Sequence, residues 1–280
     1  MTKDTISIVT VTYNCKDLLE GTILSVINQS YKNIEYIIID GASTDGTLDI
    51  IKKYEEHIDY WISEPDEGIY YAMNKAIEKA SGDWINFMNA GDSFADNDTV
   101  RSVINNLDSD TDIIYGDHLN SKREVCSVEH RQDVLISIPC CHQSMFARTK
   151  LMKENPFDTL YNISADYDFV LKMYKYGKKL QYIREPISVY LEGGLSERDK
   201  TQRELETLAS YINNKVDVST IINTVPYSSL IKQSLEYKKL NKQYNELKHV
   251  IYELSCISIL KHPLKKVKKY KELMVLLYAK

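Results

Sequence analysis

This sequence of 280 residues has few of the residues that would assign it to a disulfide-stabilised, zinc-binding or membrane-spanning class. Its five cysteines are scattered and form no CxxC pair, so neither a zinc finger nor a disulfide framework is indicated. No run of apolar residues approaches the roughly 20 that a membrane helix needs. The first residues lack the three regions of a signal peptide, so we expect a cytoplasmic location.

Neither positively nor negatively charged residues are in large excess. Lys and Arg number 35 and Asp and Glu number 40, for a net charge of −5, so nothing in the overall charge attracts nucleic acid. Apolar residues make up 43% and charged residues 27%, which is typical of a globular protein and excludes a fully disordered chain.

The first 90 residues alternate between strand-like and helix-like patterns, which indicates an α/β fold with a parallel sheet covered on both faces. The expected strands are 6–12, 34–39, 60–62 and 84–88, and the expected helices are 17–27, 47–54 and 69–80. The middle of the chain is less regular. There we expect strands at 113–115 and 182–183, and a helix at 166–176 that ends at Gly177.

The composition changes near residue 215, so we divide the chain into a domain of residues 1–215 and a helical, Lys-rich extension of residues 216–280. Apolar residues at steps of three and four within 230–254 predict a helix that packs on its own domain or forms a homodimer seam. Residues 261–280 contain seven lysines. They fit a basic amphipathic helix on an anionic membrane surface at the inner face of the cell membrane, or a solvated charged face.

Acidic side chains follow three of the four expected parallel strands. Asp40, Asp66 and Asp92 come at or just after strand ends, where ligands bind in open α/β sheets. Surface turns also favour Asp, so each loop alone is weak evidence, and the argument rests on their sharing one edge. GASTDGT lacks the lysine of a P-loop, and no GxGxxG is present. Carboxylates would therefore hold a diphosphate through Mg²⁺ or Mn²⁺.

Four ordered motifs resemble a known family: ISIVTVTYN, DGASTDGT, SEPDEGIYYAMNKAI and WINFMNAGD. They are similar to the N-terminal half of glycosyltransferase family 2, in the subgroup of bacterial polysaccharide and O-antigen biosynthesis. Later segments, YGD, CHQSMF, SADYDF and YLEGGLS, extend the similarity to about two-thirds of the chain. The resemblance implies an inverting enzyme with the GT-A fold, a Rossmann-like, mostly parallel central sheet flanked by helices.

The resemblance assigns nucleotide-side roles to residues near the first three strands. Asp40 matches the aspartate that family members use on the uracil or ribose of the donor. Thr12, Tyr13 and Asn14 match the first nucleotide loop. Asp66 matches an aspartate on the nucleotide side that follows the third strand.

The segment Asn89-Ala90-Gly91-Asp92 stands where the family has its acidic DXD-type motif. Two of the acidic positions are Asn89 and Gly91 in this chain, so only Asp92 is left as a carboxylate ligand for the metal. One carboxylate with two phosphate oxygens can still hold Mg²⁺. Asn89, Ala90 and Gly91 would then line the donor site.

The family's catalytic aspartate matches Asp166, with Ala165 where a glutamate is more usual and Asp168 as the neighbouring alternative. Without the resemblance, Asp166 would be interpreted as a helix N-terminal charge stabilised by the macrodipole. We expect Asp166 to act as general base on the acceptor hydroxyl.

Four further residues are assigned to the acceptor side or to a loop over the diphosphate. Gly193, Gly194 and Ser196 resemble the family's flexible covering segment. The position of His142 in CHQS resembles an acceptor-side position, and the alternative is a histidine packed in a loop or core.

The leading hypothesis is a metal-dependent transfer of a sugar from a UDP-sugar to a hydroxyl of a lipid-linked saccharide in cell-surface polysaccharide synthesis. A nucleotidyltransferase would need a basic, Gly-rich phosphate loop, whereas TYNCKDLLE has one Lys and no Gly. The remaining alternative is a catalytically impaired GT-A scaffold that uses its C-terminal helices to contact a partner or a membrane.

Overall fold

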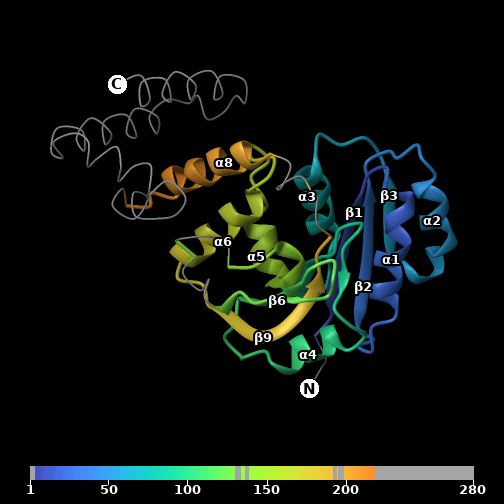
Figure 1. The fold of residues 1–280 in the computed structure, drawn as a ribbon, viewed down its shortest axis with the longest axis horizontal. Helices are drawn as coiled ribbons and strands as arrows, with labels where there is room; N and C mark the ends of the chain where they lie inside the picture. Colours follow the sequence, from blue (N-terminus) through green and yellow to red (C-terminus); the bar gives the residue numbers. More distant parts are fainter. Residues whose placement is uncertain (1–3, 130–133, 136–138, 192–193, 195–198, 218–280) are drawn as a thin grey trace.

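The computed structural model describes residues 4–129, 134–135, 139–191, 194 and 199–217 (Figure 1). The strands are β1 (Ile6–Thr12), β2 (Ile34–Asp40), β3 (Tyr60–Ser63), β4 (Trp84–Phe87), β5 (Ser93–Phe94), β6 (Ile113–Leu119), β7 (Val125–Cys126), β8 (Met145–Arg148) and β9 (Leu180–Val189). The α-helices are α1 (Lys16–Ile27), α2 (Thr47–Lys53), α3 (Ile69–Lys79), α4 (Thr99–Asn105), α5 (Thr149–Glu154), α6 (Ala165–Lys175) and α8 (Lys200–Asn213), and the short 3₁₀ turns are η1 (Glu55–His57) and η3 (His142–Ser144).

These elements confirm the α/β fold. Every element expected in the first 90 residues is present within one residue of its predicted ends, as is α6. Gly177 follows α6 with a φ of +71°, the left-handed conformation that suits a glycine after a helix. The strands expected at 113–115 and 182–183 lie within the longer strands β6 and β9.

The sheet order is β3-β2-β1-β4-β8-β6-β9-β5, with β7 paired to β6. The half formed by β3, β2, β1 and β4 is parallel, as predicted. The sheet is nevertheless mixed, because β8 lies antiparallel between β4 and β6, and β5 is antiparallel to β9. The alternation of helix and strand patterns predicts only strands that are joined by parallel crossovers. It could not predict β8, a short antiparallel strand that begins at residue 145.

The register aligns the carboxyl ends of the parallel strands. Thr12 at the end of β1 pairs with Asp40 at the end of β2, and Asp40 pairs with Ser63 at the end of β3. The loops of residues 13–15, 41–46, 64–68 and 88–92 therefore open on one side, which we call the carboxyl edge.

Both faces of the sheet are buried, because alternate side chains of each strand point to opposite faces. Ile37 and Ile39 pack in a cluster with Met73 of α3, and Ile38 packs in a second cluster with Leu19 of α1. Figure 1 shows α1 and α2 on one face of the sheet and α3, α5 and α6 on the other. This burial explains why β1 and β2 carry apolar residues on both of their faces.

Helix α8 packs against α6 and was not predicted. The predicted domain boundary at residue 215 stays a prediction, because all but residues 216 and 217 of the extension lie outside the described residues. The predicted heptad seam of 230–254 and the basic segment of 261–280 lie outside the described residues. The homodimer and the membrane contact that depend on them stay predictions.

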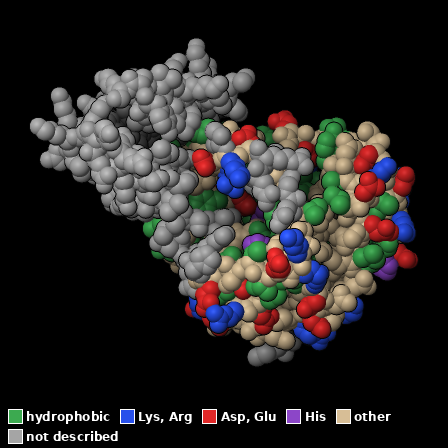
Figure 2. All heavy atoms as spheres, viewed as in Figure 1, with side chains coloured by type: hydrophobic (Ala, Val, Ile, Leu, Met, Phe, Trp, Pro, Cys, Tyr) green, Lys and Arg blue, Asp and Glu red, His purple; other side chains and the backbone are tan. Residues whose placement is uncertain are grey.

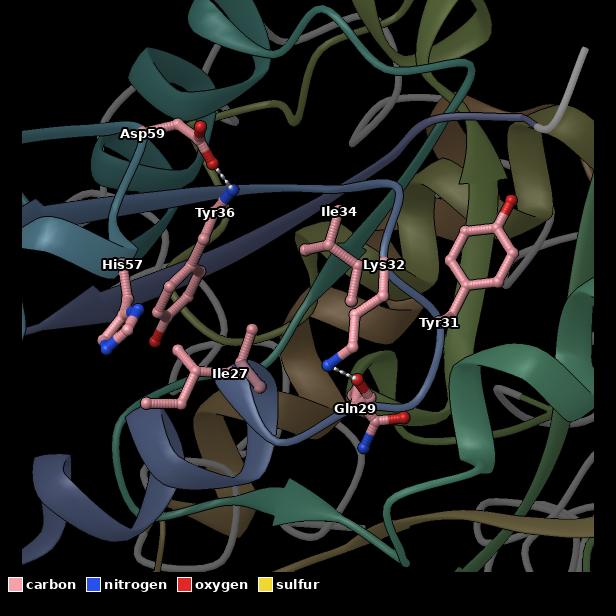
Figure 3. Close-up of a pocket in the computed structure, with 9 residues that line it drawn as sticks. Ile27, Gln29, Tyr31, Lys32, Ile34, Tyr36, His57 and Asp59 are labelled. Carbon is pink, nitrogen blue, oxygen red and sulfur yellow. Dashed lines mark hydrogen bonds between the residues drawn. The ribbon is translucent and has the colours of Figure 1, made fainter.

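The face in Figure 2 carries acidic and basic side chains interspersed, with no field of one sign among the described residues. In the described residues, no helix combines the length and the apolar character needed to cross a membrane. A small pocket lies near the start of β2, at the opposite end of this strand from the carboxyl edge (Figure 3). Its polar groups bond within the protein: Asp59 accepts from the backbone N–H of Tyr36 at 2.7 Å, and Lys32 donates to the carbonyl of Gln29 at 2.9 Å. We assign it no ligand.

Candidate active site

The carboxylate of Asp40 is fully buried at the carboxyl edge. It accepts hydrogen bonds from the backbone N–H of Ser43 at 2.9 Å, from the hydroxyl of Ser43 at 2.5 Å and from the hydroxyl of Ser63 at 2.6 Å. Asp40 therefore ties the loop after β2 to the end of β3.

The loop after β1 is joined to the same structure. The backbone N–H of Asn14 donates to the hydroxyl of Ser43 at 2.7 Å, and the side-chain oxygen of Asn14 accepts from the N–H of Thr44 at 2.9 Å. The hydroxyl oxygen of Thr12 is buried and has no hydrogen-bond partner among the described residues. Tyr13 projects outward, with 63% of its surface exposed.

Asp66 and Tyr13 approach each other across Gly41. A Cβ placed on Gly41 would lie 3.0 Å from Oδ2 of Asp66 and 3.3 Å from Cδ2 of Tyr13, so both side chains border the space above this glycine. The other oxygen of Asp66 accepts from the N–H of Gly68 at 2.9 Å. The structure thus brings together the five positions predicted for the nucleotide side: Thr12, Tyr13, Asn14, Asp40 and Asp66.

The loop of residues 88–92 is held by Thr22 of α1, a residue that the sequence did not single out. Gly91, whose φ is +104°, donates its N–H to the Thr22 hydroxyl at 3.0 Å, and this hydroxyl donates to the carbonyl of Asp92 at 2.7 Å. The N–H of Ala90 donates to the carbonyl of Val11 in β1 at 3.2 Å.

Asp92 is 7% exposed, and each of its carboxylate oxygens accepts a hydrogen bond. The side-chain amide of Gln143 donates to one oxygen at 2.5 Å, and the backbone N–H of Leu191 donates to the other at 2.9 Å. Burial raises the pKa of Asp92, and these hydrogen bonds oppose the rise. The roles of Gln143 and Leu191 could not be seen in the sequence, because neither lies near residue 92.

Asp166 lies in the first turn of α6 and its side chain is 14% exposed. One oxygen faces Nδ1 of His142 at 3.0 Å. The other accepts from the hydroxyl of Tyr70 at 3.1 Å and from the N–H of Tyr167 at 2.8 Å. Burial, and then the negative charge of Asp166, hold the pKa of Tyr70 well above its usual value, so this tyrosine stays a donor.

His142 connects Asp166 to the 88–92 loop. Its Nε2 lies 2.8 Å from the amide nitrogen of Asn89, and the next residue, Gln143, contacts Asp92. Asp92 and Asp166 therefore belong to one polar network, which we call the carboxylate network (Asn89, Asp92, His142, Gln143, Asp166). Asp40 lies outside this network and accepts hydrogen bonds from Ser43 and Ser63 instead.

Asp168, the alternative base, points away from this network. Its carboxylate accepts from the hydroxyl of Ser210 at 2.7 Å and from the side-chain amide of Asn214 at 2.8 Å, which ties α6 to the end of α8. Burial raises the pKa of Asp168. Of the predicted covering loop, Gly193 and Ser196 lie outside the described residues. A Cβ on Gly194 would lie 3.3 Å from the hydroxyl oxygen of Tyr190.

Glu206 of α8 holds the loop that precedes Asp166, and the sequence carried no signal for this role. Its carboxylate, in a residue only 3% exposed, accepts from the backbone N–H groups of Asn162, Ile163 and Ser164 at 2.9, 2.8 and 2.9 Å. The hydroxyl of Tyr70 shares its one hydrogen between Asp166 at 3.1 Å and the carbonyl oxygen of Ile163 at 2.8 Å. The backbone that leads to Asp166 is therefore fixed from two sides.

We expect Glu206→Gln to lower the free energy of unfolding by about 1–3 kcal/mol, because an amide keeps one acceptor oxygen and sets an NH₂ group against buried N–H donors. Urea unfolding measures the change. Glu204→Gln, two residues along the same helix and less buried, is the control and should unfold close to wild type. Equal midpoints for Glu206→Gln and wild type would contradict the role given to this carboxylate.

The residues around Asp92 fit a divalent cation. The side-chain oxygens of Asn89 and Gln143 are buried without a hydrogen-bond partner among the described residues, and amide and carboxylate oxygens are the ligands that Mg²⁺ and Mn²⁺ accept. In the part of the chain that the structure describes, no three His, Cys, Asp or Glu side chains gather as a metal site. Asp92 and Gln143 would therefore hold such an ion together with oxygens of a bound diphosphate.

Comparison with known proteins places this site in context. The sequence profile of the family described as Glycosyl transferase family 2 matches residues 7–183. A PGL/p-HBAD biosynthesis glycosyltransferase of Mycobacterium bovis is 28% identical over 200 residues, which cover 68% of this chain and 78% of the relative. A Bacillus subtilis glycosyltransferase named for teichuronic acid biosynthesis, TuaG, is 40% identical over 95 residues, or 33% of this chain and 38% of its own.

Two solved structures share the fold at low sequence identity. S. aureus TarS 1-349 in complex with UDP-GlcNAc has a TM-score of 0.63 at 16% identity, over 85% of this chain and 74% of its own. The mannosyltransferase PcManGT from Pyrobaculum calidifontis, in complex with GDP-Man and Mn²⁺, has a TM-score of 0.64 at 15% identity, over 100% and 89%.

Proposed function

The chain belongs to glycosyl transferase family 2, and we propose that it transfers a sugar from a UDP-sugar to a hydroxyl group of a lipid-linked saccharide. The transfer inverts the configuration at the anomeric carbon and contributes to bacterial cell-surface polysaccharide synthesis. The observation that carries the proposal is the carboxylate network, in which Asp166 and Asp92 are linked through His142 and Gln143 at the carboxyl edge. One carboxylate serves the acceptor, and the other serves the leaving diphosphate.

The nucleotide side of the edge suits a nucleoside. The exposed ring of Tyr13 offers a surface for stacking a base, and Asp66 offers acceptor oxygens beside it for base N–H or ribose hydroxyl groups. Asp40 shapes this side by holding the loop after β2, and it would act on the nucleotide through Ser43. TarS is solved with UDP-GlcNAc and PcManGT with GDP-Man, and both of these ligands are nucleotide sugars.

Asp166 is the proposed general base. As the acceptor oxygen attacks the anomeric carbon, its O–H bond breaks and the proton passes to the Asp166 carboxylate. A new C–O bond forms at the anomeric carbon while the bond to the nucleotide diphosphate breaks on the opposite face, which inverts the configuration. A carboxylate kept mostly out of water and fixed by Tyr70 needs little rearrangement in this step.

Asp92, with the side-chain oxygen of Gln143, would hold Mg²⁺ or Mn²⁺. When bound, such an ion supplies positive charge against the diphosphate as it leaves. The raised pKa of Asp92 means that a proton competes for this carboxylate, so the ion is expected to bind better as the pH rises. PcManGT is recorded with Mn²⁺, which supports testing that ion first.

A donor panel tests the proposal. Wild-type protein is incubated with UDP-sugars and GDP-mannose, with and without Mn²⁺, and release of the nucleotide diphosphate is measured. We expect metal-dependent release from one UDP-sugar above all others. Preferred release of GDP would overturn the choice of nucleotide. Absence of release with every donor, together with no binding of UDP at millimolar concentration, would favour the scaffold alternative.

A further inference from the structure

Asn89 occupies a position where the resembling family has an acidic residue, and the structure shows what the amide contacts. Its nitrogen lies 2.8 Å from Nε2 of His142, whose Nδ1 lies 3.0 Å from Asp166. Asn89 is 8% exposed, and the side chains of His142 and Asp166 are 16% and 14% exposed. Three side chains from three separate segments thus form one mostly buried chain of contacts.

The chemistry of the three groups sets the direction of each hydrogen bond. An amide NH₂ only donates, so Nε2 of His142 must be the unprotonated ring nitrogen in this contact. The ring proton is then on Nδ1, which donates it to the carboxylate of Asp166. Histidine tautomers are set in this way by the partner of the opposite nitrogen.

We propose that Asn89 and His142 are positioning residues for Asp166. Asn89 selects the tautomer of His142, and His142 then holds one oxygen of Asp166, so that the carboxylate is oriented toward the acceptor hydroxyl. This inference rests on the proposed function, because it takes Asp166 as the base. It also explains why an amide replaces a carboxylate at this position, since an aspartate at position 89 would accept from Nε2 and would not select the ring protonated on Nδ1 alone.

A consequence is that the 88–92 loop and the base are linked. The same loop carries Asp92, whose carboxylate contacts Gln143 beside His142. Nε2 of His142 is taken up by Asn89, so the imidazole is not free to receive the proton of the acceptor. His142 therefore acts through Asp166 and not on the substrate.

Three substitutions of His142 test the role. Asparagine places its NH₂ near the position of Nδ1 and can still donate to Asp166. Glutamine places its NH₂ near Nε2 and keeps only the side toward Asn89, and alanine removes both contacts. We expect kcat for transfer to fall about 10–100-fold in His142→Gln and His142→Ala, the usual size for a lost supporting contact, with KM for the donor unchanged. His142→Asn should keep more of the wild-type kcat than the other two variants, because it alone retains a donor toward Asp166.

Other results would overturn the proposal. These are an active His142→Gln beside an inactive His142→Asn, wild-type activity in all three variants, or an equal loss of UDP affinity in all three, which would indicate a structural role. Transfer by the wild-type protein in the same assay distinguishes a failure of this inference from a failure of the proposed function. An inactive wild type would refute the proposed function itself.

A measurement that does not depend on catalysis tests the tautomer of His142 directly. The ring ¹⁵N shifts of His142 at neutral pH should report a proton on Nδ1 in the wild type. Asn89→Asp should add a proton to Nε2, because a carboxylate accepts where the amide donates. A wild-type ring with its only proton on Nε2 would refute the assignment, whatever the activity.

Discussion

Asp166→Asn is expected to lower the rate of sugar transfer roughly 10²–10⁴-fold, the usual contribution of a general base. The asparagine has nearly the same shape, and its oxygen can still accept from Tyr70 or from the N–H of Tyr167. It has no basic oxygen for the acceptor proton. Transfer to a saccharide acceptor measures the rate, and calorimetry with UDP measures nucleotide binding, which should stay close to wild type.

Asp168→Asn is the matched control for this prediction. It lies two positions along the same helix, but its carboxylate contacts Ser210 and Asn214 of the α8 region. The amide oxygen of asparagine can still accept from Ser210 and Asn214, so transfer should be nearly unchanged. If Asp168→Asn loses transfer while Asp166→Asn keeps it, the base has been assigned to the wrong aspartate.

The second large effect is expected at Asp92. A metal-held leaving group is worth several kcal/mol of transition-state stabilisation, so Asp92→Asn should lower Mn²⁺-dependent release of UDP by about 10²–10³-fold. The fold should survive, because an amide oxygen can still accept from the N–H of Leu191, although the new NH₂ group faces the donor of Gln143.

Release of UDP as a function of Mn²⁺ concentration, with a thermal melt for each protein, measures this effect. Asp98→Asn is the control, because Asp98 is an exposed aspartate six residues further on whose carboxylate accepts from the hydroxyl of Ser30. Its Mn²⁺ response should match the wild type. An Asp92→Asn protein with an unchanged response to Mn²⁺ would show that the ion, where it acts, is held by other groups.

Most strands and helices of the parallel half of the sheet could be predicted from the local pattern of apolar residues. Strands β1 and β2 are rich in apolar and β-branched residues on both faces, and helix α3 has one apolar side, so their existence and order could be predicted without coordinates. Parallel strands in such an order must align their carboxyl ends. That is why Tyr13, Asp40 and Asp66 could be placed on one edge from the sequence.

The second half resisted prediction because its pairings are not local. Strand β8 is only four residues long and lies antiparallel between β4 and β6, so its neighbours are about 60 and 30 residues away in the chain. The contacts of Gln143 and Glu206 with the site depend on this packing. No spacing in the sequence could reveal them.

By itself, the sequence determined the α/β class, the family and the candidate aspartates, because each of these is written in neighbouring residues or in loops after predicted strands. The tertiary structure decided what each carboxylate does. It buried Asp40 among serines, turned Asp168 toward α8, and joined Asp92 to Asp166 through His142 and Gln143. The physical reason is that the chemistry of a carboxylate is set by the donors around it, and here most of those donors come from distant parts of the chain.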